Sequence, residues 1–289
     1  QQTRVGGTVC ISFFLEEKRQ VVLDFQGKFS GACIVNGKKR VATMRNEHIY
    51  MPAKMTKKGM NTVEMNFTCQ DKALSRTSDF IYTQYAPDKA HSCFPCFDQP
   101  DIFATFTTQM NAPEGWKTSV STSEYAIPTS LYAFIAGRFD EQSAQRGDIK
   151  IRVLHREKDA QKTSQATAII NDASQALRWM EGYTGLKYPF SEFGIIILPD
   201  SQTLPSIEHA GAIVLSDQQT FLATKATKEE QDGRLTVIGR ETAKQWLGNM
   251  VTLQWTKDED SKGLLSSYLA AKMARQQYPK VDNELMALK

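Results

Sequence analysis

The spacing of apolar residues changes near residue 157, and this change divides the chain into two parts. Up to about residue 155, short runs rich in Val, Ile, Phe and Thr alternate with polar residues, as in GTVCISFFLE and NTVEMNFTCQD. A period of two residues is typical of strands with one buried face. Beyond residue 160 the apolar residues recur every three or four positions, which is typical of helices. We therefore expect an α+β protein with an antiparallel β domain over residues 1–157 and a mixed α/β domain over residues 158–289.

Three helices are predicted in the second part, and FGIIILPD and GAIVLS are predicted strands between the first and the second. Thr163 or Ser164 is expected to cap the first helix, and Asp260 or Ser261 the third, because Ser, Thr and Asp side chains accept hydrogen bonds from the first helical N–H groups. The residues that mark the three helices are Ile169, Ile170, Ala173, Leu177 and Met180, then Leu235, Ile238, Thr242, Trp246 and Leu247, then Leu264, Leu265, Tyr268, Leu269 and Met273.

The charged residues nearly balance, with 35 Lys and Arg against 32 Asp and Glu and a formal net charge of +3. Obligate partners such as nucleic acid or an anionic membrane select for a strong basic excess, so neither is expected. The sequence contains no run of about 18 apolar residues, so no membrane-spanning helix is predicted.

Five cysteines are present, and an odd, sparse set is not typical of a disulfide framework. Cys93 and Cys96, in CFPC, have the C-x-x-C spacing of a redox or metal-binding pair. A second such pair is absent from the sequence, and the strand, motif and helix order of redox proteins is not evident. We therefore favour buried structural cysteines and keep redox or metal use as the alternative.

The stretch VIGRETAKQWLGNMVTLQW, residues 237–255, has the frame of a zinc-peptidase helix. In a helix of type H-E-x-x-H, two histidines at i and i+4 bind one zinc ion and the intervening Glu activates a water molecule. Here Glu241 stands between Arg240 and Lys244. Guanidinium and ammonium groups are hydrogen-bond donors only at neutral pH, so neither can bind zinc.

Five segments resemble, in order, landmarks of the aminopeptidase N family of zinc peptidases, the gluzincins. They are YTQYAPDKAHSCFPCFDQPDIFATF, SLYAFIAGRF, ALRWMEGYTGLKYPF, PSIEHAGAIVL and RETAKQWLGNMVTLQWTKD. The fourth resembles the G-x-M-E-N exopeptidase motif of the family in its M-E-H variant, and the fifth resembles its zinc helix. The resemblance implies a saddle-like N-terminal β domain, a partial thermolysin-like domain and, in the family, a zinc cofactor. Bacterial members with the M-E-H variant are often cell-envelope or periplasmic proteins.

Carried over position by position, the zinc ligands of the family fall on Arg240, Lys244 and Gly263, with eighteen residues between the last two. None of these three side chains is a metal ligand, so we expect the zinc cofactor to be absent. The general-base position of the family falls on Glu241. We hypothesise that the two cations replace the metal electrostatically for nearby carboxylates, because an unpaired buried carboxylate costs several kcal/mol or shifts its pKa upward.

Two further positions match residues that bind substrate in the family. Glu208 matches the glutamate that holds the free α-amine of a peptide, and Gln84 matches a glutamine that lines the first specificity pocket. Each could instead have a structural role only. The catalytic tyrosine of the family would lie beyond residue 289. A zinc site rebuilt from His48, His91, His155 and His209 is a further, less favoured alternative.

The leading prediction is a catalytically inactive aminopeptidase-like protein, a pseudopeptidase that binds peptides or a partner protein or serves as a structural subunit of a larger assembly. The first alternative is an active aminopeptidase with an unorthodox metal site. It would forfeit the lowered pKa of metal-bound water and several kcal/mol of oxyanion stabilisation. The second alternative is a pure scaffold in which the β domain carries the binding.

Overall fold

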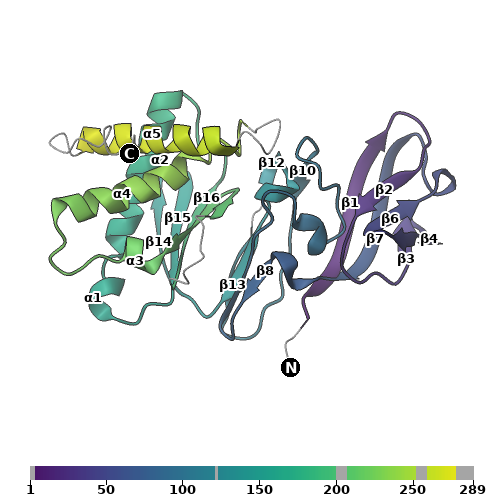
Figure 1. Ribbon diagram of the computed structural model, residues 1–289, viewed down its shortest axis with the longest axis horizontal. Helices are drawn as coiled ribbons and strands as arrows, with labels where there is room; N and C mark the ends of the chain where they lie inside the picture. Colours follow the sequence, from purple (N-terminus) through teal and green to yellow (C-terminus); the bar gives the residue numbers. More distant parts are fainter. Residues whose placement is uncertain (1–3, 121–122, 200–206, 252–258, 278–289) are drawn as a thin grey trace. The chain divides into compact units, whose positions relative to one another are not determined.

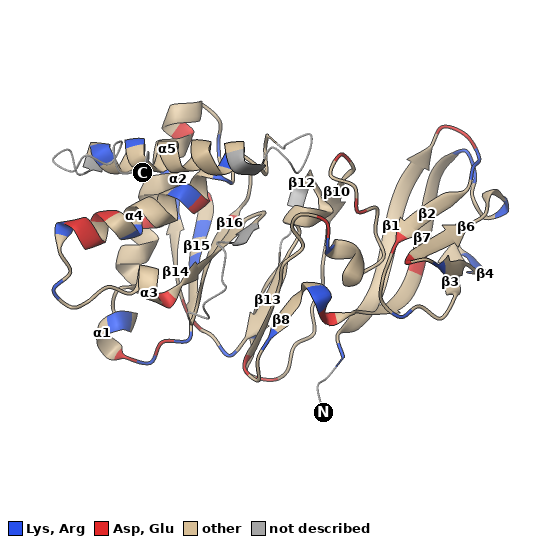
Figure 2. Ribbon diagram, viewed as in Figure 1, with Lys and Arg blue, Asp and Glu red and all other residues tan. Residues whose placement is uncertain are grey.

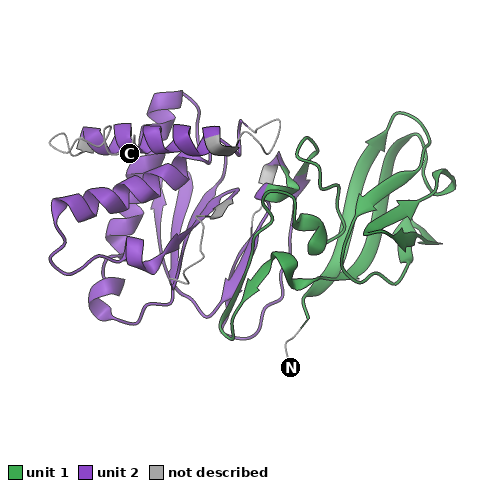
Figure 3. Cartoon of the chain, viewed as in Figure 1, with its two compact units in different colours: residues 1–104, 128–130 green, residues 105–127, 131–289 purple. Residues whose placement is uncertain are grey.

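The structure is a computed structural model that describes residues 4–120, 123–199, 207–251 and 259–277. The chain forms two compact units (Figure 3): residues 1–104 with 128–130, and residues 105–127 with 131–289. The predicted α+β class, with an antiparallel β-rich part followed by helices and strands, is confirmed. Within the described ranges, no helix is long and apolar enough to cross a membrane.

The first unit contains two antiparallel sheets (Figure 1). One sheet has the order β1-β7-β3-β4 and the other β2-β6-β5. The strands are β1 Gly6–Leu15, β2 Val21–Asp24, β3 Ala32–Val35, β4 Lys38–Val41, β5 Thr43–Arg45, β6 His48–Met51 and β7 Gly59–Thr68. Strands β1 and β7 pair along their whole length, from Gly6 opposite Thr68 to Leu15 opposite Gly59.

The core of the first unit follows from the alternation in the sequence. In β7, Asn61, Val63 and Met65 are buried, whereas the residues between them are exposed. Successive side chains of a strand point to opposite faces, so these three lie on one face. Val63 and Met65 share a hydrophobic core with buried residues of both sheets, which include Val35 of β3 and Leu23 of β2.

The other elements of residues 53–137 are short and are divided between the two units. They are η1 Ala53–Met55, η2 Asp71–Ala73, β8 Leu74–Arg76, β9 Phe80–Thr83, η3 Ala90–Ser92, β10 Phe103–Phe106, β11 Lys117–Val120, β12 Ser123–Pro128, η4 Thr129–Leu131 and β13 Phe134–Gly137. β8 pairs antiparallel with β9, and β11 pairs antiparallel with β13.

The second unit is built on a five-stranded mixed sheet of order β14-β15-β16-β18-β17. Its strands are β14 Asp140–Arg146, β15 Ile149–His155, β16 Glu192–Leu198, β17 Ile207–His209 and β18 Ala212–Ser216. β15, β16 and β18 are parallel neighbours, and β14 and β17 are antiparallel edges. β14 and β15 therefore share a sheet with later strands. The division into domains at residues 157 and 158 stays a prediction.

Helices pack around this sheet (Figure 1) and are α1 Ala160–Thr163, α2 Ala166–Thr184, α3 Asp217–Thr220, α4 Lys228–Ala243 and α5 Glu259–Gln277. α2 packs on β14 and β15, and α4 packs against both α2 and α5. Arg234 of α4 donates from Nε to Asp172 of α2 at 2.7 Å. Ala176, Leu235 and Met273 form a small buried cluster between the three helices.

Several predicted helix boundaries and faces need correction. Asp159 caps α1, while Gln165 at the start of α2 makes no side-chain cap, so the predicted caps Thr163 and Ser164 are wrong. Helix α5 already includes Glu259 at its N-terminal end, so Asp260 and Ser261, the predicted caps, lie within the helix. Of the five residues predicted to lie on the buried face of α5, only Leu269 and Met273 are buried. The side of α5 that faces α4 carries Met273 together with the buried Ala270. Leu264, Leu265 and Tyr268 are exposed.

Candidate functional site

Helix α4 begins with a capping box and ends at the predicted site. The Thr227 hydroxyl accepts from the N–H of Glu230, and the Glu230 carboxylate accepts from the N–H of Thr227. This arrangement satisfies two N–H groups that would otherwise lack partners. Gly239, one turn before the end, faces α5, where an added Cβ would meet the methyl group of Met273. The end of α4 therefore lies against α5.

A buried carboxylate lies between two cations at this end of the helix. Glu241 has no exposed surface. Its Oε1 accepts from Arg240 Nε at 2.9 Å, and its Oε2 accepts from Lys244 Nζ at 2.9 Å. The Lys244 side chain is 13% exposed and that of Arg240 is 37% exposed. We call these three residues the Glu241 cluster. Figure 2 shows acidic and basic residues interspersed along α4.

The geometry of the Glu241 cluster determines what it can do chemically. A carboxylate acting as a general base must lie within hydrogen-bond reach of the proton that it removes. Here each oxygen accepts a charge-assisted bond, and the side chain has no exposed surface through which a water molecule could reach it. Neither cation offers a lone pair to a metal ion. The arrangement therefore suits an internal ion cluster with one net positive charge and does not suit a zinc ligand set.

A second group of polar side chains fastens the chain after α4 to the β17–β18 hairpin. Gln245 has no exposed surface, accepts from the N–H of Gly211 at 3.0 Å and donates to the His209 carbonyl at 2.9 Å. Asn249 donates to Gln245 Oε1 at 2.8 Å. Sequence reasoning missed this network. The only feature of the sequence that could have indicated this network is the position of Gln245, a polar residue directly before Trp246, which was predicted to be buried.

Replacing Gln245 with Ala is expected to lower the free energy of unfolding by about 2–3 kcal/mol, because the hairpin N–H and carbonyl would stay buried without partners. Chemical denaturation monitored by circular dichroism measures the change. Gln145→Ala is the matched control, since Gln145 makes one exposed bond to the Gly147 carbonyl. We expect an effect of roughly 0.5 kcal/mol there. Equal effects in the two variants would contradict the structural role of Gln245.

His209 lies in the hairpin beside Glu208, with a buried ring. Burial lowers the pKa of His209 from 6.5 to about 3, so the ring is neutral in the folded protein at neutral pH. Neither ring nitrogen has a hydrogen-bond partner within the described part of the chain. Among the same described residues, no group of three or more His, Cys, Asp and Glu side chains is placed to hold a metal ion.

This buried histidine predicts a pH dependence of stability. Because the folded pKa of His209 is lower than the unfolded one, the unfolded chain binds the extra proton first and stability falls as pH drops below 6.5. The loss attributable to His209 is about 2 kcal/mol between pH 7.5 and pH 5. Urea denaturation of the wild type and of His209→Gln at both pH values measures it. An unchanged pH dependence in the variant would contradict the assignment.

The structure does not bring all the predicted residues together. Arg240, Glu241 and Lys244 are in contact. Glu208 lies in β17 opposite Ile213, and its side chain lies outside the described part. Gly263 lies in α5, seven residues before Ala270, which faces Gly239 of α4.

Seven residues are close to two helical turns, so Gly263 and Ala270 share the side of α5 that faces α4. A Cβ at Gly263 would meet no atom within 4 Å.

The remaining predicted residues lie elsewhere. Gln84 follows β9 in the first unit, is half-buried and donates its N–H to the Ala73 carbonyl. Trp246 is buried, as expected, and donates to the Leu186 carbonyl at 3.1 Å. The second tryptophan expected in the core, Trp255, lies outside the described residues.

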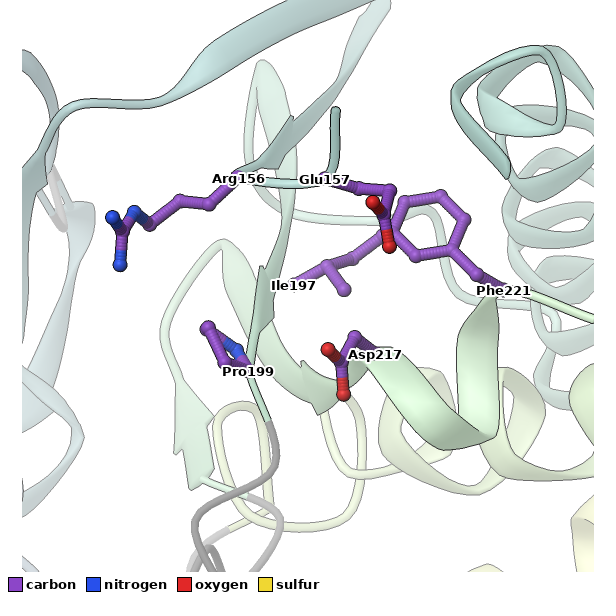
Figure 4. Close-up of a pocket in the computed structure, with 6 residues that line it drawn as sticks. All are labelled: Arg156, Glu157, Ile197, Pro199, Asp217 and Phe221. Carbon is purple, nitrogen blue, oxygen red and sulfur yellow. The ribbon is translucent and has the colours of Figure 1, made fainter. Parts of the chain in front are cut away.

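A cavity of about 250 Å³ lies at the carboxyl ends of the three parallel strands β15, β16 and β18, and none of the predicted site residues lines it (Figure 4). Its lining residues are Arg156, Glu157, Ile197, Pro199, Asp217 and Phe221. In Figure 4 the Glu157 carboxylate lies beside the Phe221 ring and the Arg156 guanidinium points away from the other residues. Glu157 is already engaged by Lys162 at 3.0 Å and by backbone N–H groups. None of the residues that line this cavity belongs to the Glu241 cluster.

Comparison with known families places the site in context. Residues 35–125 match the model of the peptidase M1 N-terminal domain, and residues 169–288 match that of the peptidase family M1 domain. The chain belongs to peptidase family M1. The Glu241 cluster falls within the second matched range, as do α4 and the β17–β18 hairpin.

Proteins with similar sequences come from bacteria, plants and animals. The chain is 28% identical to aminopeptidase N of Streptomyces lividans over 197 residues, which cover 62% of this chain and 22% of the relative. It is 28% identical to aminopeptidase M1 of Arabidopsis thaliana over 192 residues, 60% of this chain and 21% of the relative. Against bovine aminopeptidase N the identity is 23% over 249 residues, 73% of this chain and 26% of the relative. The matches thus span about a fifth to a quarter of these relatives.

Proposed function

We propose that this family M1 chain is a pseudopeptidase, which binds a peptide or protein without hydrolysing it. The observation that carries the proposal is the occupation of both Glu241 oxygens by cationic donors at 2.9 Å in a fully buried position. A general base must reach a water molecule, and a peptidase of this family must polarise the scissile carbonyl with a metal. The Glu241 cluster supports neither step.

The proposal assigns Arg240, Lys244 and Gly263 to the three zinc-ligand positions of the family. Two cations and a glycine do not fit a zinc ion, whose ligands are neutral histidine nitrogens, thiolates and carboxylates. Arg240 and Lys244 instead supply positive charge beside the buried Glu241 and form ion pairs with it.

Glu208 is proposed as the group that still grips the α-amine of a bound peptide. Its strand, β17, is the edge of the five-stranded sheet and has β18 on one side. Among the described strands its other edge has no partner, which leaves backbone groups for an extended peptide. Gln84 is proposed to contribute to the first side-chain pocket.

An activity assay tests the proposal. Purified protein is incubated with a panel of aminoacyl p-nitroanilides, with and without added zinc, beside an active aminopeptidase as positive control. We expect no release of nitroaniline above background. Metal-dependent turnover that disappears in Glu241→Gln would contradict the proposal and favour an active aminopeptidase with an unorthodox metal site.

Binding measurements separate peptide recognition from a purely structural role. Calorimetric titration with a peptide library carrying free N-termini is repeated with the same peptides acetylated. Preference for the free amine, lost in Glu208→Gln, supports amine recognition. Equal binding of both forms removes Glu208 from the proposal, and absence of binding to either form favours a scaffold in a larger assembly.

A further inference from the structure

The thiols of the first unit include a close pair that the sequence did not identify. Cys69 Sγ and Cys93 Sγ lie 3.1 Å apart, and both cysteines are free. The structure assigns to Cys69 and Cys93 the role of a redox-active dithiol, a site of reversible disulfide formation with a small disulfide as the oxidant. The partner of Cys93 is thus not Cys96, the other half of its C-x-x-C motif.

Backbone contacts hold these two thiols together before any bond forms. Cys69 directly follows β7, and its N–H donates to the Val5 carbonyl at 2.8 Å. The next residue, Gln70, donates its N–H to the Ser92 carbonyl at 2.9 Å, which places the chain before Cys93 against the end of β7. The two sulfurs are already within about 1 Å of bonding distance, so oxidation needs only a small shift.

The surroundings of Cys93 differ from those of Cys96, the other cysteine of the C-x-x-C motif. Hydrogen bonds from Cys69 and Tyr85 lower the pKa of Cys93, although burial opposes them. Burial raises the pKa of Cys96, and the backbone of Cys96 is fixed to Asp24 of β2 by hydrogen bonds in both directions. Because the thiolate is the reactive form, Cys93 is the better nucleophile of the motif.

The exchange proceeds in two steps. Cys69 is partly exposed, so a small disulfide can reach its sulfur. The hydrogen bond to Cys93 and burial raise the pKa of Cys69, so the adjacent Cys93 sulfur takes up its proton as Cys69 attacks, forms a mixed disulfide and releases one small thiol. Cys93, buried beside it, then attacks the Cys69 sulfur, forms the internal disulfide and releases the second small thiol. Two protein thiols lose an electron pair to the small disulfide, and their two protons end on the released thiols.

The test uses the full chain with Cys10→Ser, which removes the exposed thiol. The protein is equilibrated in buffers of reduced and oxidised glutathione, trapped with an alkylating agent and analysed by mass spectrometry and peptide mapping. We expect loss of two hydrogens, two fewer alkylated thiols and a cross-link between Cys69 and Cys93. The melting temperature should rise by about 5 °C on oxidation, because the closed loop restricts the unfolded chain.

Two variants show which cysteine pairs with Cys69. Cys93→Ser should abolish the internal disulfide, and Cys96→Ser should retain it. A cross-link between Cys93 and Cys96, a stable glutathione adduct without an internal disulfide, or oxidation only of unfolded protein would each overturn the proposal. Mapping of the parent chain decides this point even where a variant fails to fold.

Discussion

Replacing Arg240 and Lys244 together with methionine should lower the free energy of unfolding by about 3–5 kcal/mol, because the buried Glu241 carboxylate would keep no cationic partner. Methionine retains most of the apolar stem of both side chains, so the effect reports charge and hydrogen bonding. Urea denaturation at pH 7 measures it. Adding Glu241→Gln to the double variant should recover most of the loss, since the uncompensated charge disappears.

A matched control separates a buried ion cluster from ordinary surface pairing. Lys158 pairs with Asp140 at 2.6 Å, but their side chains are 77% and 54% exposed. Lys158→Met should cost less than about 1 kcal/mol. If the double variant costs no more than this control, or if Glu241→Gln gives no recovery, the cations do not compensate the charge of Glu241.

The second large effect is expected from rebuilding the zinc ligands. The triple variant Arg240→His, Lys244→His and Gly263→Glu should bind zinc at least about 1000-fold more tightly than the wild type, because histidine nitrogens and a carboxylate replace two cations and a glycine. Lys244 keeps right-handed helical backbone angles, so the two histidines would have i, i+4 spacing on one helix face. Gly263 has open space for a side chain. Competition with a chromogenic chelator measures the affinity.

Gly263→Glu alone is the control for the triple variant, since it adds a carboxylate while both cations remain. It should bind zinc no better than the wild type. Circular dichroism confirms that each variant folds. A folded triple variant without zinc affinity would show that the three positions do not converge, which would contradict their assignment as ligand positions.

The sequence predicted the fold class because the change from a two-residue to a 3.6-residue period is a local signal. It did not correctly predict the buried face of every helix. In α5, apolar residues occur on more than one side, and only packing against α4 selects Leu269 and Met273 over Leu264 and Tyr268. The start of α2 was placed too early because Thr163 and Ser164 resemble caps, although they belong to α1 and its end.

The candidate site was predictable in part. Lys244 lies close to Arg240 and Glu241 because residues three or four apart share a helix face. The ion pair between Arg240 and Glu241 joins adjacent residues, which this spacing does not predict. Full burial of Glu241 depends on tertiary packing that spacing does not reveal. The contacts of Gln245 are backbone groups of a hairpin more than thirty residues earlier. Likewise, the C-x-x-C spacing pointed to Cys96, whereas the course of the chain after β7 brings Cys69 to Cys93.

Zinc titration of the wild-type chain, with metal analysis of the purified protein, tests the central claim most directly. We expect no stoichiometric zinc after purification in zinc-containing buffer and no saturable binding at micromolar concentrations, because Arg240 and Lys244 are not metal ligands and form ion pairs with Glu241. One zinc ion per chain, bound tightly and released on substitution of Glu241 or Glu208, would contradict it.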